Sequence, residues 1–329
     1  MYAKDNNMEK INNKTEENIA EQKIDLRVGI AIVATLIFWA STFAGIKVGL
    51  TAYNPGHLVL LRFLTASVVL LLYAFLVRMP FPDKKDIPIL LLLGFIGITV
   101  YNLSLTYGEI KVAAGSASLL IASAPIFTAI LAKFILKEDI SIWGWVGILI
   151  SFLGISLIVR GEGGAVSFEP AAFLILLSAI CISTFFVFQK PLLKKYSALQ
   201  FTAYAIWSGT LFQLVFIGGL LQNIKEAPFG ATITIVYMGI FPAALAYVTW
   251  AYALSRAPVS VMGSYLNISP VIAMLIAWIW LGEIPTRLTL IGGSLALIGV
   301  ALVNICGKGN RGKIKDNSLP DKEGYNHET

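Results

Sequence analysis

Ten apolar segments follow one another between residues 28 and 305, each near the length that a helix needs to cross the hydrocarbon of a bilayer. Short polar connections separate them, and these are often marked by Gly, Pro or charge, as at Asn54-Pro55-Gly56. The pattern predicts an all-α membrane protein. We expect spans at residues 28–49, 56–77, 87–108, 113–136, 142–159, 170–189, 199–221, 232–253, 259–281 and 288–305.

The two ends of the chain differ from the part between them. Residues 1–27 are rich in Asn, Glu and Lys and hold no apolar core of signal-peptide length, which predicts a disordered arm. The chain is polar again from about Lys308, so we expect residues 307–329 to form a disordered tail. No separate soluble domain is predicted.

Composition points to the same class. The 329 residues are 57% hydrophobic and 13% charged, whereas soluble domains average about 25% charged residues. The net charge of +6 comes from basic residues in loops and tails, so we expect membrane lipids as partners and no nucleic acid. Two cysteines and two histidines lie far apart along the chain, which predicts no disulfide framework, no metal site and no cofactor.

The distribution of basic residues predicts the orientation in the membrane. If the N-terminus is cytoplasmic, 18 of the 25 Lys and Arg residues lie in inside segments, and only 4 lie in outside segments. Cytoplasmic loops carry the excess of positive charge in membrane proteins. We therefore expect a multi-pass protein of the cell (plasma) membrane with both termini in the cytoplasm.

One stretch of sequence occurs twice. Ser123-Ala124-Pro125 through Glu138 recurs as Ile268-Ser269-Pro270 through Glu283, an offset of 145 residues that holds without a gap from Ile89 to Gly154. The first two spans of each half align at an offset of 142. Because each half holds five spans, an odd number, the second half must enter the membrane from the opposite side. We expect inverted five-helix repeats at residues 28–161 and 162–306.

Small residues recur on one face of the fifth and tenth predicted spans. Gly147 and Gly154 are two helical turns apart, and Gly292 and Gly299 repeat the arrangement. Small faces allow helices to approach closely. We expect these spans to serve as packing struts or as a dimer surface, so the protein is a monomer or a homodimer.

The charges inside the predicted spans are positive. Lys47 and Arg62 lie in the outer parts of their spans, where a cation costs about 2.5–3.5 kcal/mol on insertion scales. Either side chain could snorkel to the interface or face the protein interior. No Asp or Glu lies inside a span, and Glu109 falls at or beyond a helix end. Embedded positive charge would suit a substrate with a carboxylate or phosphate, and a carboxylate-centred proton relay for cationic drugs is disfavoured.

Polar and aromatic residues within the spans complete the candidates for a substrate cavity. Asn side chains in lipid must bond between helices or face water, Ser and Thr can bond to their own helix, and aromatic residues can simply pack in the core. The full candidate set is Trp39, Thr42, Lys47, Arg62, Tyr101, Asn102, Ser183, Thr184, Tyr247, Trp250, Tyr265 and Asn267.

The repeated stretch also supplies candidates for hinges and gates. Pro125, Pro270 and Pro242 would each interrupt a helix and free carbonyls one turn earlier. The result is either a static kink or a hinge. Glu138 and Glu283, the last residues of the two copies, either form matching gates on opposite faces or merely cap short loops.

The chain resembles the drug/metabolite transporter superfamily, specifically its ten-span EamA-type branch. The resemblance covers roughly residues 28–306 and is carried by the residues just described together with Leu61-Arg62-Phe63 and the run Phe38-Trp39-Ala40-Ser41-Thr42-Phe43-Ala44-Gly45-Ile46-Lys47. It implies two five-helix bundles around a central cavity that work by alternating access. The short drug-efflux members differ, because they carry a glutamate in their first helix.

These observations favour a secondary transporter of small organic metabolites, such as amino acids or related carboxylate-bearing solutes. Export is favoured over import. The alternatives are an intramembrane enzyme, or a membrane scaffold or receptor that transports nothing. The sequence has no P-loop, nucleophile elbow or zinc-binding helix motif, which disfavours an ATP-driven pump and an enzyme.

Overall fold

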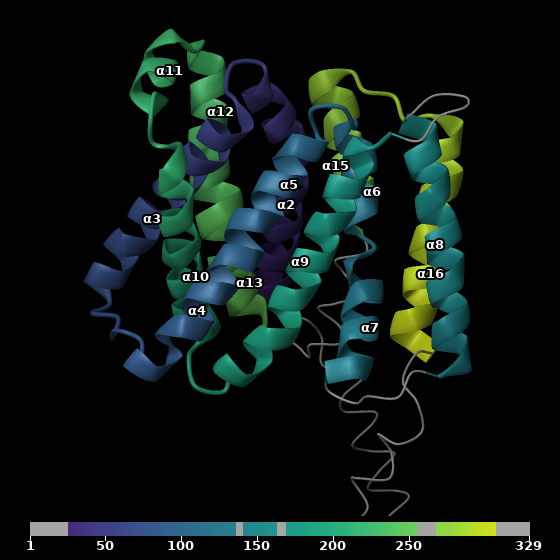
Figure 1. Cartoon of the computed structure of the whole chain (residues 1–329), viewed down its shortest axis with the longest axis horizontal. Helices are drawn as coiled ribbons and strands as arrows, with labels where there is room; N and C mark the ends of the chain where they lie inside the picture. Colours follow the sequence, from purple (N-terminus) through teal and green to yellow (C-terminus); the bar gives the residue numbers. More distant parts are fainter. Residues whose placement is uncertain (1–25, 136–140, 163–168, 255–267, 307–329) are drawn as a thin grey trace, which may run out of the picture.

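The computed structural model describes residues 26–135, 141–162, 169–254 and 268–306, and throughout these ranges the regular structure is helical (Figure 1). The first half of the described chain contains α2 (Leu26–Leu50), α3 (Pro55–Leu76), η1 (Lys84–Asp86), α4 (Ile87–Gly94), η2 (Phe95–Val100), α5 (Tyr101–Gly108), α6 (Ala114–Ile121), α7 (Ala124–Ile135) and α8 (Ile142–Glu162). The second half contains α9 (Ala171–Leu192), α10 (Ala198–Gln213), η3 (Leu214–Phe216), α11 (Leu220–Glu226), α12 (Phe229–Ile240), η4 (Phe241–Leu245), α13 (Ala246–Leu254), α15 (Ser269–Leu281) and α16 (Arg287–Cys306).

These helices fall at the positions of the predicted spans, with one clear correction. Five helices of the described chain are long and apolar enough to cross a membrane, and a sixth qualifies if a bent pair is counted as one. The bent pair lies in the predicted span 199–221, where the axis turns by 82° between Phe216 and Leu220. Gly219 adopts a left-handed φ of 80° at this bend, a conformation that glycine adopts without strain. The full set of ten spans stays a prediction.

Local sequence explains where several helices begin and end. The Asn54 side chain accepts a hydrogen bond from the backbone of His57 and caps α3, whose first residue is Pro55. Ser197 and Gln200 form a reciprocal capping box at the start of α10. Gly282 ends α15 in the left-handed conformation, with φ 72°.

Two of the helices contain a π-helical segment, and the two segments are related by the sequence repeat. η2 spans Phe95–Val100, and an offset of 145 places it on residues 240–245, which coincide with η4, Phe241–Leu245. The predicted interruption at Pro242 is therefore present as a π-helical turn. The predicted interruption at Pro125 is present as a short turn between α6 and α7. Such departures leave backbone carbonyls free for other partners.

The small-residue faces of α8 and α16 pack against each other. A Cβ built on Gly154 would lie 2.5 Å from the carbonyl oxygen of Gly292, and one built on Gly299 would lie 2.4 Å from that of Gly147. The two helices therefore run antiparallel with their backbones in close contact. The Ser151 hydroxyl also donates a 3.0 Å hydrogen bond to the Ala296 carbonyl across this contact. Of the two expected roles, packing strut or dimer surface, these faces fill the first.

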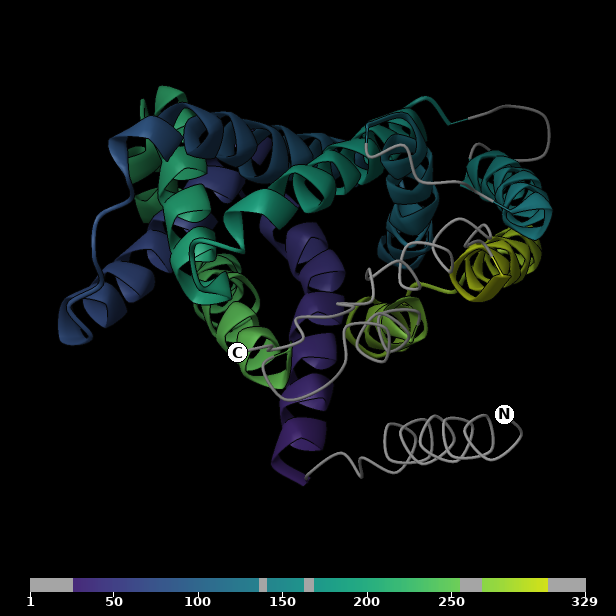
Figure 2. The ribbon, with the colours of Figure 1, turned by 90° about the horizontal axis from the view of Figure 1, so that it is seen from below.

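The remaining helices interleave the two halves of the chain. α2 and α3 of the first half contact α12 of the second, while α9 and α10 of the second half contact α4, α5 and α7 of the first. Seen from below, α8 and α16 form a pair at one side of this group (Figure 2). The central core consequently joins residues from both halves, among them Phe63, Leu93, Phe201 and Met238.

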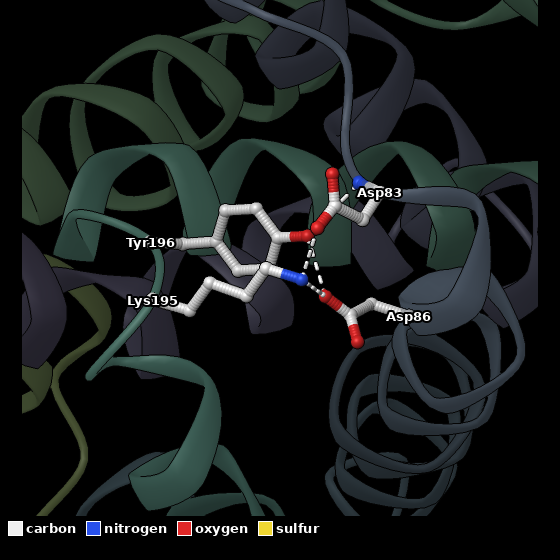
Figure 3. A network of polar contacts seen from close by, with 4 residues as sticks. All are labelled: Asp83, Asp86, Lys195 and Tyr196. Atoms are coloured by element: carbon white, nitrogen blue, oxygen red, sulfur yellow. Dashed lines mark hydrogen bonds and ion pairs between the residues drawn. The ribbon is translucent and has the colours of Figure 1, made fainter.

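A polar network joins η1 to the connection between α9 and α10 (Figure 3). The Lys195 ammonium forms ion pairs with Asp83 and, at 2.7 Å, with Asp86. The Tyr196 hydroxyl donates to Asp86 at 2.6 Å and accepts from the Asp83 backbone at 2.9 Å. The hydrogen bonds that the Lys195 ammonium donates to Asp83 and Asp86 raise its pKa above its ordinary value. The network ties the loop after α3 to the loop before α10.

The close contact of α8 with α16 predicts the effect of a single methyl group. Gly154→Ala forces a Cβ into the α16 backbone, so we expect a loss of about 1–3 kcal/mol of stability, visible as a lower melting temperature in detergent. Gly29→Ala is the matched control, because its Cβ would meet no atom within 4 Å. An equal melting temperature for both variants would contradict the packing described here.

The polar network predicts a salt-sensitive contribution to stability. The Lys195 side chain is 45% exposed and that of Asp83 63% exposed, so solvent and salt screen the ion pairs. We expect Lys195→Met to lower the melting temperature modestly at low salt, with the difference shrinking as salt is added. The neighbouring exposed Lys194 provides the control variant Lys194→Met. A difference that salt leaves unchanged would point to packing instead.

Candidate functional site

Arg62 is a charged residue that is buried among the helices. It lies on the third helical turn of α3 and is 7% exposed, so its guanidinium does not reach the surface. Its Nη1 donates a 3.3 Å hydrogen bond to Asn102 Oδ1, and Asn102 is held in turn by a 2.7 Å bond from Nδ2 to the Ile98 carbonyl of η2. Arg62 Nε has no hydrogen-bond partner, and no described carboxylate forms an ion pair with the guanidinium.

A polar stripe on α5 and its C-terminal cap lies beside this arginine. Asn102, Thr106 and Glu109 are spaced by four and three residues, so they share one face of the helix. All three are at most 2% exposed. Seven residues of α-helix rise by about 10 Å, which gives the approximate length of the stripe. Unsatisfied polar atoms gather here, since Thr106 Oγ1 and both Glu109 oxygens also have no hydrogen-bond partner in the described chain.

Glu109 is the functional candidate that the sequence interpretation missed. It does lie one residue beyond the end of α5, as expected, but its side chain is fully buried rather than at the surface. Burial raises the pKa of the Glu109 carboxyl well above its ordinary value, and Lys47 opposes the shift. The charge of Glu283 raises the pKa of Glu109 further, and that of Arg62 lowers it. The position of Glu109 beyond the helix end agrees with the prediction, but the burial of its side chain was not predicted. The helical spacing of Glu109 from Asn102 and Thr106, which places all three on one face, could have identified Glu109 as a candidate from the sequence.

Lys47 and Glu109 line a cavity of about 300 Å³ where α2, α3 and α5 come together. Lys47 stands in the last turn of α2 and is partly exposed. The other lining residues are Leu50, Thr51, Tyr53, Pro55 and Ile110. The cavity is therefore bordered by the partly exposed Lys47 and the buried Glu109, and its other lining residues are uncharged.

An aromatic cluster joins α2 to α13. The Trp39 ring meets Tyr247 edge-on with centroids 5.6 Å apart, and it lies 5.3 Å from the Trp250 ring. Trp39 Nε1 donates a 3.2 Å hydrogen bond to the Pro242 carbonyl in the π-helical segment η4. Tyr101 and Tyr247 also lie within electrostatic range of Arg62. The cluster thus borders the arginine site from the second half of the chain.

Three other predicted cavity residues make bonds to helix backbone. Ser183 is fully buried and donates to the Ala179 and Ala124 carbonyls, which joins α9 to the start of α7. Thr42 and Thr184 donate to the carbonyls four residues earlier in their own helices, at 3.4 Å and 2.9 Å. The structure does not bring these residues together with Arg62. Tyr265 and Asn267 lie outside the described residues.

The repeated stretch places its candidates at helix starts and between the halves. Pro125 and Pro270 are each the second residue of a helix, α7 and α15. Glu283, just past α15, accepts a 2.7 Å hydrogen bond through Oε2 from the backbone N–H of Ala114, the first residue of α6. This contact joins the two halves of the chain. Glu138 lies outside the described residues.

The structure therefore gathers part of the predicted set into one region. Arg62 and Asn102 bond directly, Lys47 lines a cavity with Glu109, and the Trp39 ring packs against those of Tyr247 and Trp250. Among the described residues no group of three or more His, Cys, Asp or Glu could hold a metal ion. The arrangement offers one buried and one partly exposed cationic donor together with aromatic side chains, which suit a small molecule that carries a carboxylate.

Comparison with known proteins defines the class. The helical fold is that of a multi-pass membrane protein, and a solved crystal structure aligns with 86% of this chain and 100% of its own chain at a TM-score of 0.58 and 17% identity. The EamA-like transporter family matches residues 27–160 and again residues 169–305. The chain belongs to this family and is a transporter.

Curated relatives agree with this assignment. The chain is 44% identical over 262 residues to the uncharacterized transporter YdfC of Bacillus subtilis (strain 168), covering 80% of this chain and 86% of the relative. It is 37% identical over 276 residues to a probable terminal-alkyne amino-acid exporter of Streptantibioticus cattleyicolor, covering 83% and 92%. Relatives of this kind point to a transporter rather than an enzyme.

The unpaired burial of Arg62 predicts an unusual response to its removal. Arg62→Met keeps most of the side-chain length and removes a charge whose burial in a span costs about 2.5–3.5 kcal/mol. Only one long hydrogen bond is lost in exchange. We expect a melting temperature in detergent that is no lower than that of the wild type. A marked drop would show that Arg62 is retained for structure. The exposed Arg160 gives the matched control Arg160→Met.

Proposed function

We propose that the protein is a secondary transporter of small carboxylate-bearing organic solutes, amino acids first among them. It would export them across the plasma membrane by alternating access, with both termini in the cytoplasm. One observation carries the choice of substrate class: the Arg62 guanidinium is buried and bonded to Asn102, yet it has no ion-pair partner among the described residues. Such a cation is a ready partner for an anionic ligand.

The surroundings of Arg62 support an amino acid in particular. Lys47, in the last turn of α2, supplies a second cationic group. The side chains of Trp39, Tyr247 and Trp250 supply apolar and aromatic surface. Sites for small molecules combine mostly apolar walls with a few placed polar groups. The relative named as a probable amino-acid exporter handles the same chemistry. Its name also supports export as the direction.

Alternating access needs two halves that can rearrange, and the packing supports inverted repeats. The contact of Gly154 with Gly292 is matched by that of Gly147 with Gly299, and the offset of 145 turns one contact into the other, because Gly147 corresponds to Gly292 and Gly154 to Gly299. A two-fold relation between antiparallel copies has this property. In the same way, Gly94 packs on α10 and its repeat equivalent Gly239 packs on α3.

The junctions between the halves supply the moving parts in this proposal. Pro125 and Pro270 stand at the starts of α7 and α15 as candidate hinges, while Glu283 joins α15 to the start of α6 through Ala114 as a candidate gate. Opening on that side would break the bond between Glu283 and Ala114. Glu138 stays the proposed counterpart on the cytoplasmic side.

Counterflow in proteoliposomes tests the function. Vesicles loaded with one unlabelled amino acid should accumulate the same labelled amino acid, and a panel of L-amino acids identifies the preferred one. We expect the corresponding amine, which lacks the carboxylate, to compete at least tenfold less well, because one charge-assisted contact is worth about 1.5–3 kcal/mol. Arg62→Met should reduce counterflow by a similar or larger factor.

Controls separate loss of transport from loss of protein. Arg160→Met should transport as the wild type does, because Arg160 is exposed at the end of α8. Equal reconstitution of the variants is checked by protein recovery in the vesicles. Undiminished counterflow in Arg62→Met, or an amine that competes as well as the amino acid, would contradict the proposal.

A further inference from the structure

Glu109 is a buried carboxyl group. The proposed binding of a solute carboxylate at Arg62 does not explain its role. It is 0% exposed, and neither Oε1 nor Oε2 has a hydrogen-bond partner in the described chain. An ionised carboxylate in this state would lose its hydration without compensation, which costs several kcal/mol. The side chain must therefore be neutralised, either by a proton or by a cation that enters from outside.

The charged and titratable groups around Glu109 come from several elements. Lys47 of α2 and Arg62 of α3 favour the ionised form, while Glu283 beyond α15 and burial itself favour the protonated form. Tyr101 of α5 lies in electrostatic range, and Tyr53 lines the adjoining cavity. Burial is the largest of these influences on the pKa of Glu109. Neither cation forms an ion pair with it in the described chain.

The adjoining cavity has room for a small ligand with both charges. Its volume of about 300 Å³ lies at the low end for small-molecule sites. Its two charged lining residues, Lys47 and Glu109, have opposite sign, and an ionised Glu109 can receive the ammonium group of a solute whose carboxylate binds Arg62. A metal ion is a poor occupant, since Glu109 faces two cations and no described cluster of metal ligands includes it.

We propose that Glu109 holds a proton while the cavity is empty and releases it when the ammonium group of a zwitterionic amino acid takes its place. The proton leaves the carboxyl group for water, and the carboxylate formed accepts hydrogen bonds from the ammonium. No other reactant is needed. This inference rests on the proposed transport of amino acids and adds to it the ion that is exchanged for the solute.

Competition at one carboxyl group couples the two ligands. Protons and solute cannot occupy Glu109 together, so a site that alternates between the two faces exchanges one for the other. Protons that enter from outside would then drive solute out. At pH values below the pKa of Glu109, the apparent affinity for the amino acid should rise by up to about tenfold per pH unit, and it should level off above that pKa.

Infrared difference spectroscopy of the purified protein tests the proton directly and needs no substrate. We expect a protonated-carboxyl band that persists well above the pH at which an ordinary glutamate ionises, is absent in Glu109→Gln and is restored in Glu109→Asp. Glu226→Gln, which removes an exposed carboxylate, should leave the band as it is. A band lost only at the ordinary pKa of glutamate, or one that survives in Glu109→Gln, would overturn the proposal.

A second arm adds L-alanine, L-valine and L-leucine, each with its N-acetyl derivative as the control that lacks the ammonium group. We expect the amino acid that binds best by thermal shift to abolish the carboxyl band and release close to one proton per protein, while its N-acetyl derivative releases none. A bound amino acid that leaves the band intact would overturn the exchange. If none of the counterflow panel binds or is transported, the proposed function fails, and the infrared titration still decides whether Glu109 holds a proton.

Discussion

The constraint on which the proposed function depends is a guanidinium held inside an apolar helical bundle with no counter-ion among the described residues. Arg62 contacts Asn102 through one 3.3 Å hydrogen bond and otherwise lies among buried side chains. Packing alone would favour an apolar residue at this position. Asn102 of the polar stripe bonds to the guanidinium, and the buried carboxyl group of Glu109 lies within electrostatic range of both Arg62 and the second cation, Lys47.

The two halves of the chain share a scaffold but not this chemistry. Glycine contacts and π-helical segments recur at the offset of 145 residues, so the packing of the ancestral unit has been kept. The polar stripe has not been kept, because Tyr247 and Leu254 stand where the first half has Asn102 and Glu109. The first half thus supplies charge, while the second supplies the aromatic surface of Tyr247 and Trp250 against Trp39.

Sequence alone predicted the helical class, the repeat and the breaks at Pro125 and Pro242, because apolar run length and proline act locally. It also predicted Arg62, Lys47 and Trp39 as notable residues. It did not predict the π-helical segment at Phe95–Val100, which contains no proline, or the bend at Gly219. Glu109 was assigned to a helix end, which is correct, but its burial depends on helices that lie far away in the sequence. Ser183 shows both cases, since its bond to the Ala179 carbonyl of its own helix was expected, whereas its bond to the distant Ala124 carbonyl was not predictable.

The most direct test of the central claim is an experimental structure of the protein with the preferred amino acid bound. The account predicts that the carboxylate of the ligand lies within hydrogen-bond distance of the Arg62 guanidinium, beside Asn102 and close to the aromatic cluster of Trp39. A ligand bound elsewhere, or a carboxylate of the protein itself on Arg62 in the bound state, would contradict it.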